Sequence, residues 1–97
     1  MRVLRKEPGG TWKPAEVENK LEALQKAVGG YLESFTFTTD VCILCDEEGR
    51  LKGAAHNTTI LGVDFVGTIL MVGVAGEEFT DLTEQQEAML RAGGVIP

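Results

Sequence analysis

An apolar stripe that runs into a double glycine constrains this chain more than any other feature. The stripe has the spacing of one face of a helix and consists of Val17, Leu21, Leu24 and Val28. Gly29 and Gly30 follow directly, and a glycine at this place adopts the left-handed conformation that ends many helices. Pro14 suits the first helical turn, where its missing N–H costs nothing. The pattern predicts a helix over residues 15–28.

The segment after the double glycine has the pattern of a β-strand. Residues 31–38 are rich in aromatic and β-branched side chains, which favour strands. Tyr31, Phe35 and Phe37 share one side of this strand, and we expect that side to face the helix. Glu33 lies on the same side, which places it either at the end of the sheet or in a partly enclosed site.

Further strands follow on both sides of a polar stretch. Residues 41–45 predict the next strand, Asp46-Glu47-Glu48-Gly49 predicts a hairpin turn, and residues 50–52 are expected to begin the return strand. Residues 53–62 are small and polar and are expected to form a loop. Residues 65–74 are almost wholly apolar and β-branched, and they predict a central strand.

The two ends of the chain complete the predicted fold. Residues 1–6 are expected to open a strand and residues 75–78 to form a turn, while Thr83 and Gln86 have the capping-box spacing of a helix over residues 83–92. The apolar tail, residues 95–97, is expected to pack on a neighbour or to fray. The sequence predicts a single α+β domain over residues 1–97. Its small mixed, mainly antiparallel sheet of about four to five strands carries the helix of residues 15–28 and the short C-terminal helix.

Charge excludes several classes of function. The 97 residues carry a net charge of −6, which argues against general nucleic-acid or membrane-surface binding. Residues 1–13 contain four cations and one acid and sum to +3, so the remainder sums to −9. No apolar run reaches the ~18 residues of a spanning helix, and residues 2–6 lack the apolar core of a signal peptide. We therefore expect a cytoplasmic protein.

Catalytic and metal-binding patterns are present only in fragments. Cys42 and Cys45 have C-x-x-C spacing, but on a strand they point to opposite faces and are expected to be structural. Ser34 and His56 are the only residues of their kinds, and Ser34 lacks the glycine elbow of an exposed nucleophile. The side chains of adjacent acids in the 46–49 turn point in different directions, so they do not form an acid–base pair. Gly29-Gly30 follows a helix, whereas a phosphate-binding loop precedes one. The sequence predicts neither an enzyme nor a cofactor or metal site.

A binding surface remains as the functional hypothesis. The 53–62 loop places four polar side chains beside an apolar strand, and loops on a rigid scaffold often carry recognition residues. Asn57 either binds a ligand or caps the backbone of its own loop. Trp12, beside Lys13, either stacks on a ring or covers the core. The candidate ligand-binding residues are Arg5, Trp12, Tyr31, Glu33, His56, Asn57 and Thr58.

Several of these motifs together resemble one family. In order they are Leu21-Glu22-Ala23-Leu24-Gln25, Val28-Gly29-Gly30-Tyr31-Leu32-Glu33, Glu47-Glu48-Gly49, Asn57 and Val66-Gly67-Thr68. Over roughly residues 3–85 the chain resembles the bacterial and phage domain-of-unknown-function family numbered 3846. That family usually has asparagine where this chain has Asp46 and a basic residue where it has Thr58. An anion contact made by that basic residue does not carry over to Thr58.

The resemblance implies where such a protein occurs and which mechanisms it could use. Members are small proteins of phages, plasmids and integrated elements, which implies a role against host defence in a bacterial cell. We favour a sponge, which is a homo-oligomer that sequesters a cyclic nucleotide or ADP-ribose-type signal between its subunits. For such a protein we expect Asn57→Ala to abolish ligand binding and to leave the melting temperature of the unliganded protein nearly unchanged. The alternatives are an acidic inhibitor that binds a host defence protein, which the net charge favours, and an accessory protein.

Overall fold

Eight strands and two helices make up the fold, and the computed structural model describes residues 1–97. The strands are β1 (Arg2–Lys6), β2 (Lys13–Glu16), β3 (Leu32–Thr38), β4 (Val41–Asp46), β5 (His56–Ile60), β6 (Val63–Val66), β7 (Ile69–Ala75) and β8 (Glu78–Thr80). The helices are α1 (Leu21–Val28) and α2 (Glu84–Ala92). Neither helix has the length and apolar character needed to cross a membrane.

The main sheet is built around β7. Its strand order is β2-β1-β7-β4-β3, with β8 paired to β7 beyond the end of β1, and a separate hairpin joins β5 to β6. The sequence predicted a mixed, mainly antiparallel sheet, and all the pairings are antiparallel. The α+β class with one helix packed on the sheet and a C-terminal helix is confirmed.

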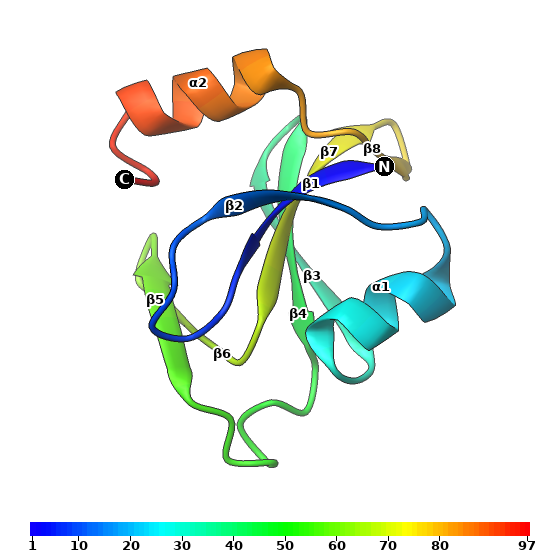
Figure 1. The fold of residues 1–97 in the computed structure, drawn as a ribbon, viewed down its shortest axis with the longest axis vertical. Coiled ribbons are helices and arrows are strands. Elements are labelled where there is room, and N and C mark those ends of the chain that lie inside the picture. The colour runs from blue at the N-terminus through cyan, green and yellow to red at the C-terminus, as the bar shows by residue number, and fades with distance from the viewer.

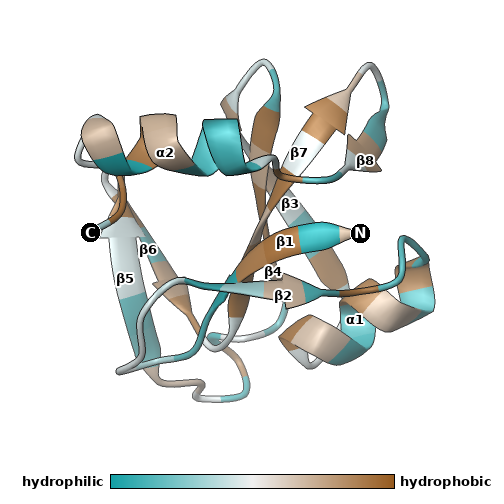
Figure 2. Cartoon of the chain, turned by 45° about the horizontal axis from the view of Figure 1, so that its top comes forward, coloured by the Kyte–Doolittle hydropathy of each residue, from teal (hydrophilic) through white to brown (hydrophobic).

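Each face of the sheet buries its own apolar cluster. One cluster joins the inner side of α1 to β1, β4 and β7 and contains Val3, Leu24, Val28, Cys42, Leu44, Leu70 and Val72. The larger cluster lies on the other face, beneath the β5–β6 hairpin, α2 and the C-terminal tail. Figure 1 shows the sheet between these layers, with α1 to the right and the hairpin to the left. In Figure 2 the hydrophobic colour covers most of β7 and the middle of β1, and β7 is buried from Ile69 to Gly73.

The first helix is shorter than predicted, because its expected start is a strand. Pro14 and Ala15 pair with Leu4 and Val3 of β1, so residues 13–16 form β2 and α1 begins only at Leu21. Val17 is not helical either, although it packs against the same apolar cluster as α1. Val17 thus fits the spacing of the helical stripe although it lies in an extended segment, because it contacts the same cluster as α1.

The Gly29-Gly30 junction has two structural roles. Gly29 has φ of 89°, and its N–H donates to the Gln25 carbonyl at 2.8 Å, which ends α1 as predicted. Gly30 lies against Asp46, where an added Cβ would be 2.6 Å from the carboxyl carbon. Only glycine lets the turn after α1 approach the end of β4 this closely.

The aromatic side of β3 faces away from α1, so that expectation is wrong. Phe35 and Phe37 pack against the larger cluster, whereas Leu32 contacts the cluster beneath α1. The rings of Phe35 and Phe65 meet edge to face, with centroids 5.3 Å apart. The aromatic residues therefore support the β5–β6 hairpin, an element that the sequence pattern did not predict.

The middle of the chain differs most from expectation. Residues 50–52 form turns rather than a return strand, and much of the predicted 53–62 loop is the strand β5. The predicted strand 65–74 is divided between β6 and β7 at Gly67, whose φ is 71°. The turn at residues 75–78 is present between β7 and β8.

The C-terminal segment closes the larger cluster. The capping box of α2 is confirmed, because the Thr83 hydroxyl accepts from the Gln86 N–H at 3.0 Å and the Gln86 side chain accepts from the Thr83 N–H at 2.9 Å. Ile96 is only 1% exposed and packs within its own chain, so the tail neither frays at this residue nor needs a neighbouring molecule to cover it.

Candidate functional site

A pocket opens where the β5–β6 hairpin crosses the ends of β3 and β4. Its volume is about 270 Å³, and we call it the acidic pocket. The floor is apolar and includes Phe35, Cys45, Val63, Phe65 and Val66, and the rim consists of Glu33, Asp46, Glu47, Arg50 and Asp64. Four carboxylates thus surround an apolar floor together with a single cation.

Hydrogen bonds hold two of the rim carboxylates, Asp46 and Asp64, in their charged form. Lys52 donates to Asp46 at 2.8 Å and lowers the pKa of that carboxyl, assisted by the Glu48 N–H at 2.9 Å. The Thr59 hydroxyl donates to Asp64 and lowers its pKa, with His56 as a further contributor. Arg50 donates at 2.6 Å to the Asp64 carbonyl oxygen. The four carboxylates of the rim outnumber Arg50 and the Lys52 that pairs with Asp46, so the pocket carries a net negative charge at neutral pH.

The cysteine in the floor is a protonated thiol at neutral pH. Burial raises the pKa of the Cys45 thiol to about 11, and the nearby negative charges of Glu33 and Asp46 act in the same direction. Cys42 lies on the opposite face of β4, in the cluster beneath α1, as the strand spacing predicted. No three His, Cys, Asp or Glu side chains are grouped so that they could hold a metal ion.

Asn57 has its polar atoms bonded within the chain. Its amide nitrogen donates to the Lys6 carbonyl at 2.9 Å and to the Gly67 carbonyl at 2.8 Å. Its side-chain oxygen accepts from the Lys6 ammonium at 2.8 Å. The residue is 8% exposed and is the extra residue of a bulge in β5, which turns its side chain toward β1. Asn57 therefore has a structural role, in which it joins the hairpin to the sheet.

The neighbours of Asn57 lie on the exposed part of β5. His56 approaches Asp64 at 3.7 Å, and the Thr59 hydroxyl donates to the same carboxylate. Thr58 is half-buried and pairs with Phe65. These side chains of the hairpin lie beside the acidic pocket but do not line the pocket.

The other predicted residues are spread over the molecule. Trp12 is 6% exposed within the larger cluster, in agreement with a role in covering the core. Arg5 pairs with Glu7 at 2.8 Å beside the turn between β1 and β2. Tyr31 is 65% exposed in a shallow hollow of about 480 Å³ at the end of α1, lined by Gln25, Lys26, Gly29, Gly30, Tyr31, Glu48 and Lys52. Of the predicted site residues, only Glu33 lines the acidic pocket.

Sequence reasoning missed most of the pocket. The sequence pattern assigns Asp46 and Glu47 to a hairpin turn and Arg50 to the start of a return strand, and Asp64 and Phe65 lie beside or within one long apolar run. The available signal is the alternation of Val63-Asp64-Phe65, which has the period of a half-exposed strand. Leu61-Gly62 before it supplies the turn that makes a hairpin, with positive φ at both residues.

Fold and pocket together define a small α+β domain with an acid-rimmed recess above its sheet. The chain belongs to the family described as a domain of unknown function, DUF3846, whose model matches residues 1–93. The match confirms the resemblance drawn from the glycine and turn motifs and extends it to both ends of the fold. No curated protein and no solved structure matches the chain.

Proposed function

We propose that this chain is a non-enzymatic binding protein whose acidic pocket takes a cationic side chain of a protein partner. The observation that carries the proposal is the set of Glu33, Glu47 and Asp64 over an aromatic floor, beside the Asp46 that Lys52 already pairs. An arginine or lysine would lay its methylene stem on Phe35 and Phe65 and bring its charge to the carboxylates. An anionic ligand would be repelled at the same place.

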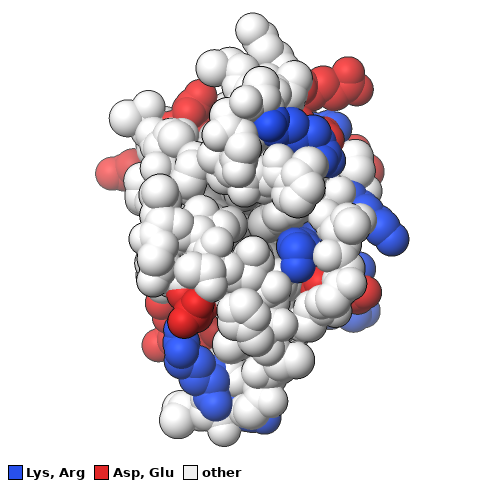
Figure 3. Space-filling model, turned by 90° about the vertical axis from the view of Figure 1, so that its left-hand side faces the viewer, with Lys and Arg blue, Asp and Glu red and all other residues white.

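The distribution of cations agrees with this choice. Arg2 and Arg91 pair with Glu87, Arg5 pairs with Glu7, and Lys52 pairs with Asp46. On the side of the molecule that carries β5, Lys and Arg side chains lie at separate places on a mostly uncharged surface, and some of them adjoin Asp or Glu (Figure 3). With a net charge of −6, the surface suits a basic partner. Given the mobile-element setting that the family resemblance implies, the partner class we propose is a host defence enzyme with a basic groove.

A matched pair of peptides tests the pocket directly. The first carries one arginine, and the second carries citrulline, which has the same shape without the charge. In NMR titrations, the arginine peptide should shift the signals of Phe35 and Phe65, and the citrulline peptide should bind about tenfold more weakly or not at all. Equal binding of the two peptides, or shifts that avoid the pocket, would refute the proposal.

Charge-matched variants separate the pocket from the overall charge. The double variant Glu33→Gln and Glu47→Gln removes two rim charges, and Glu77→Gln with Glu78→Gln removes two charges from the exposed turn between β7 and β8. The first should weaken binding of the arginine peptide and the second should leave it nearly unchanged. Equal losses would mean that only net charge matters.

A nucleotide sponge is the second candidate, and the hollow beside Tyr31 favours it. The exposed Tyr31 ring offers a stacking surface, and Lys26 and Lys52 lie on the same hollow. A melting-temperature screen against cyclic dinucleotides and ADP-ribose derivatives would detect a tight ligand by mass action. Tyr31→Ala should abolish any shift and Tyr31→Phe should keep it, with the ligand recovered intact. Recovery of a modified product would make the chain an enzyme.

A further inference from the structure

The strand β3 leaves one edge of the main sheet unpaired. It is last in the strand order, opposite β2, and in Figure 1 it lies at the back of the sheet while β2 crosses the front. The Glu47 N–H donates to the Tyr31 carbonyl at 2.7 Å, which sets the direction of the backbone groups along the strand. Because these directions alternate in an antiparallel pair, the N–H and C=O groups of Leu32, Ser34 and Thr36 point away from β4.

The two edges of the sheet are protected very differently. The outer strand β2 has only four residues and contains Pro14 next to the charged Lys13, features that discourage further pairing. The strand β3 has seven residues, Leu-Glu-Ser-Phe-Thr-Phe-Thr, with no proline, lysine or arginine. Its only charge is Glu33, in a chain with a net charge of −6. A long edge of low charge is the segment on which two acidic molecules can meet with the least repulsion.

We propose that the β3 edge pairs with the β3 edge of a second copy of this chain, antiparallel across a twofold axis. A bulge between Thr36 and Thr38 ends the regular part of β3, so the segment available for pairing is residues 32–36. Only a register centred on Ser34 pairs this whole segment with itself. Ser34 then faces Ser34 of the second copy, and Glu33 faces Phe35 of the second copy rather than another acid.

This arrangement gives each acidic pocket a neighbour of the same kind. Glu33 and Phe35 line the pocket, and the twofold axis through Ser34 brings these residues of both copies together. The two pockets then share one face, on which a single partner can place two cationic side chains. The pairing goes beyond the proposed function and does not depend on what the pocket binds.

Cysteine cross-linking tests both the edge and its register. Ser34→Cys places two thiols on the axis with Cα atoms about 5.5 Å apart, which is within disulfide range. Thr36→Cys, an equally exposed position two residues along, would place its thiols about 13 Å apart. Under mild oxidation, Ser34→Cys should form a covalent dimer and Thr36→Cys should not. The native Cys42 and Cys45 are buried and should not interfere.

Solution mass decides whether the pairing exists without a cross-link. Light scattering after gel filtration should give twice the 10.5 kDa of one chain for the unmodified protein and for Ser34→Ala. Ser34→Pro should be monomeric, because it removes an outward N–H and leaves the bonds to β4 intact; its circular dichroism should match that of Ser34→Ala. A monomeric unmodified protein would overturn the proposal, as would a dimer that Ser34→Pro leaves intact. A covalent dimer formed by Thr36→Cys and not by Ser34→Cys would overturn the register.

Discussion

At the scale of single residues, Asn57 matters because three hydrogen bonds depend on one buried side chain. It joins β5 to the Lys6 carbonyl, the Lys6 ammonium and the Gly67 carbonyl, at 2.8–2.9 Å. Replacing Asn57 by alanine removes the side-chain donor to the Lys6 and Gly67 carbonyls, and the Lys6 ammonium keeps only its 3.3 Å contact with the backbone carbonyl of residue 57. We expect a loss of about 2 kcal/mol in the free energy of unfolding. For a domain of this size, that loss lowers the melting temperature by about 10 °C, measurable by calorimetry.

The adjacent Thr58 provides the control, since its side chain takes part in none of these contacts. Thr58→Ala should change the free energy of unfolding by less than about 1 kcal/mol. The expectation from sequence was that Asn57→Ala would leave the unliganded melting temperature nearly unchanged, and the bonding of Asn57 opposes it. A melting temperature equal to that of the unmodified protein would show that the hairpin is held by its apolar contacts alone.

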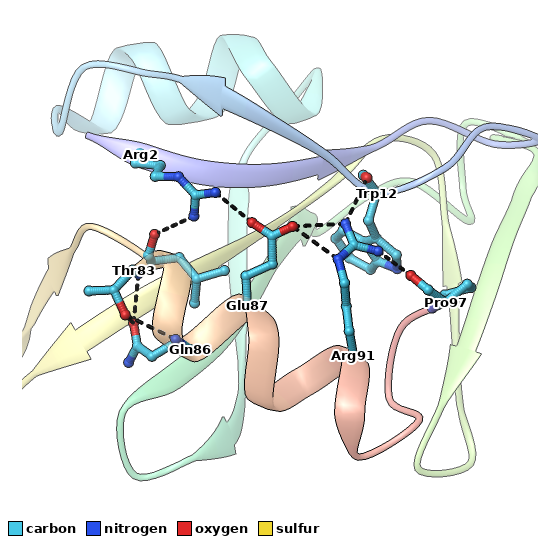
Figure 4. A network of polar contacts seen from close by, with 8 residues as sticks. Arg2, Trp12, Thr83, Gln86, Glu87, Arg91 and Pro97 are labelled. Atoms are coloured by element: carbon cyan, nitrogen blue, oxygen red, sulfur yellow. Dashed lines mark hydrogen bonds and ion pairs between the residues drawn. The ribbon is translucent and has the colours of Figure 1, made fainter.

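At the scale of secondary-structure elements, one carboxylate ties α2 to the sheet. Glu87 accepts from Arg2 of β1 at 2.5 Å and from Arg91 at 3.0 Å, while Arg91 also reaches the carbonyl oxygens of Trp12 and Pro97 (Figure 4). Arg2 further donates to the Leu82 carbonyl at 2.8 Å. The hydrogen bond from Arg2 lowers the pKa of Glu87, with Arg91 contributing in the same direction.

This network predicts a loss of stability in acid. Because the pKa of Glu87 is lower in the folded chain than its ordinary value of 4.5, the unfolded chain binds more protons in this range. The stabilisation is therefore complete above that value and is lost as the pH falls through the folded pKa. Glu87→Gln should lower the free energy of unfolding by about 1 kcal/mol at pH 7. On acidification, the free energy of unfolding of this variant should fall less than that of the unmodified protein. Chemical denaturation at pH 7, 5, 4 and 3 measures both effects.

The exposed Glu77 is the matched control for this prediction, because it has the same chemistry without the two arginines. Glu77→Gln should follow the pH dependence of the unmodified protein. If Glu87→Gln follows it as well, the ion pair contributes nothing to the attachment of α2, and the helix is held by the apolar contacts of Leu82, Leu90 and Ile96 and by the hydrogen bonds from Gln86 to Asp40.

The same scale shows why some elements were predictable from sequence. The capping box at Thr83, the turn at residues 75–78 and the end of α1 at Gly29 depend on residues close in sequence, so local chemistry specifies them. The strand β2 exists because Ala15 and Pro14 pair with Val3 and Leu4, which no local pattern indicates. The hairpin of β5 and β6 similarly depends on Asn57 reaching Lys6, a contact between residues 51 positions apart.

The candidate site was less predictable than the fold for the same physical reason. Glu33 was singled out because a charge among aromatic residues on one side of a strand is unusual in itself. Its companions Asp46, Arg50 and Asp64 become neighbours only after the hairpin folds over the sheet. Their individual patterns resemble an ordinary solvated turn and an ordinary strand, so no local signal connects them.

At the scale of the whole molecule, the two cysteines report whether both faces of the sheet unfold together. Cys42 lies in the cluster beneath α1 and Cys45 in the cluster beneath the β5–β6 hairpin. Burial raises the pKa of each thiol to about 11. The thiolate is the reactive form, so at pH 8 the folded protein should react with a thiol reagent far more slowly than an exposed cysteine.

Single-cysteine variants turn this protection into a measurement of cooperativity. Cys42→Ala leaves only the thiol beneath the hairpin, and Cys45→Ala leaves only the thiol beneath α1. If residues 1–97 fold as one cooperative domain, each thiol should become reactive only on global unfolding. Its opening free energy, obtained from the reaction rate, should then equal the unfolding free energy of the same variant within about 0.5 kcal/mol. A much lower opening free energy for Cys45 alone would mean that the hairpin opens independently, because a locally opened segment exposes only the residues it covers.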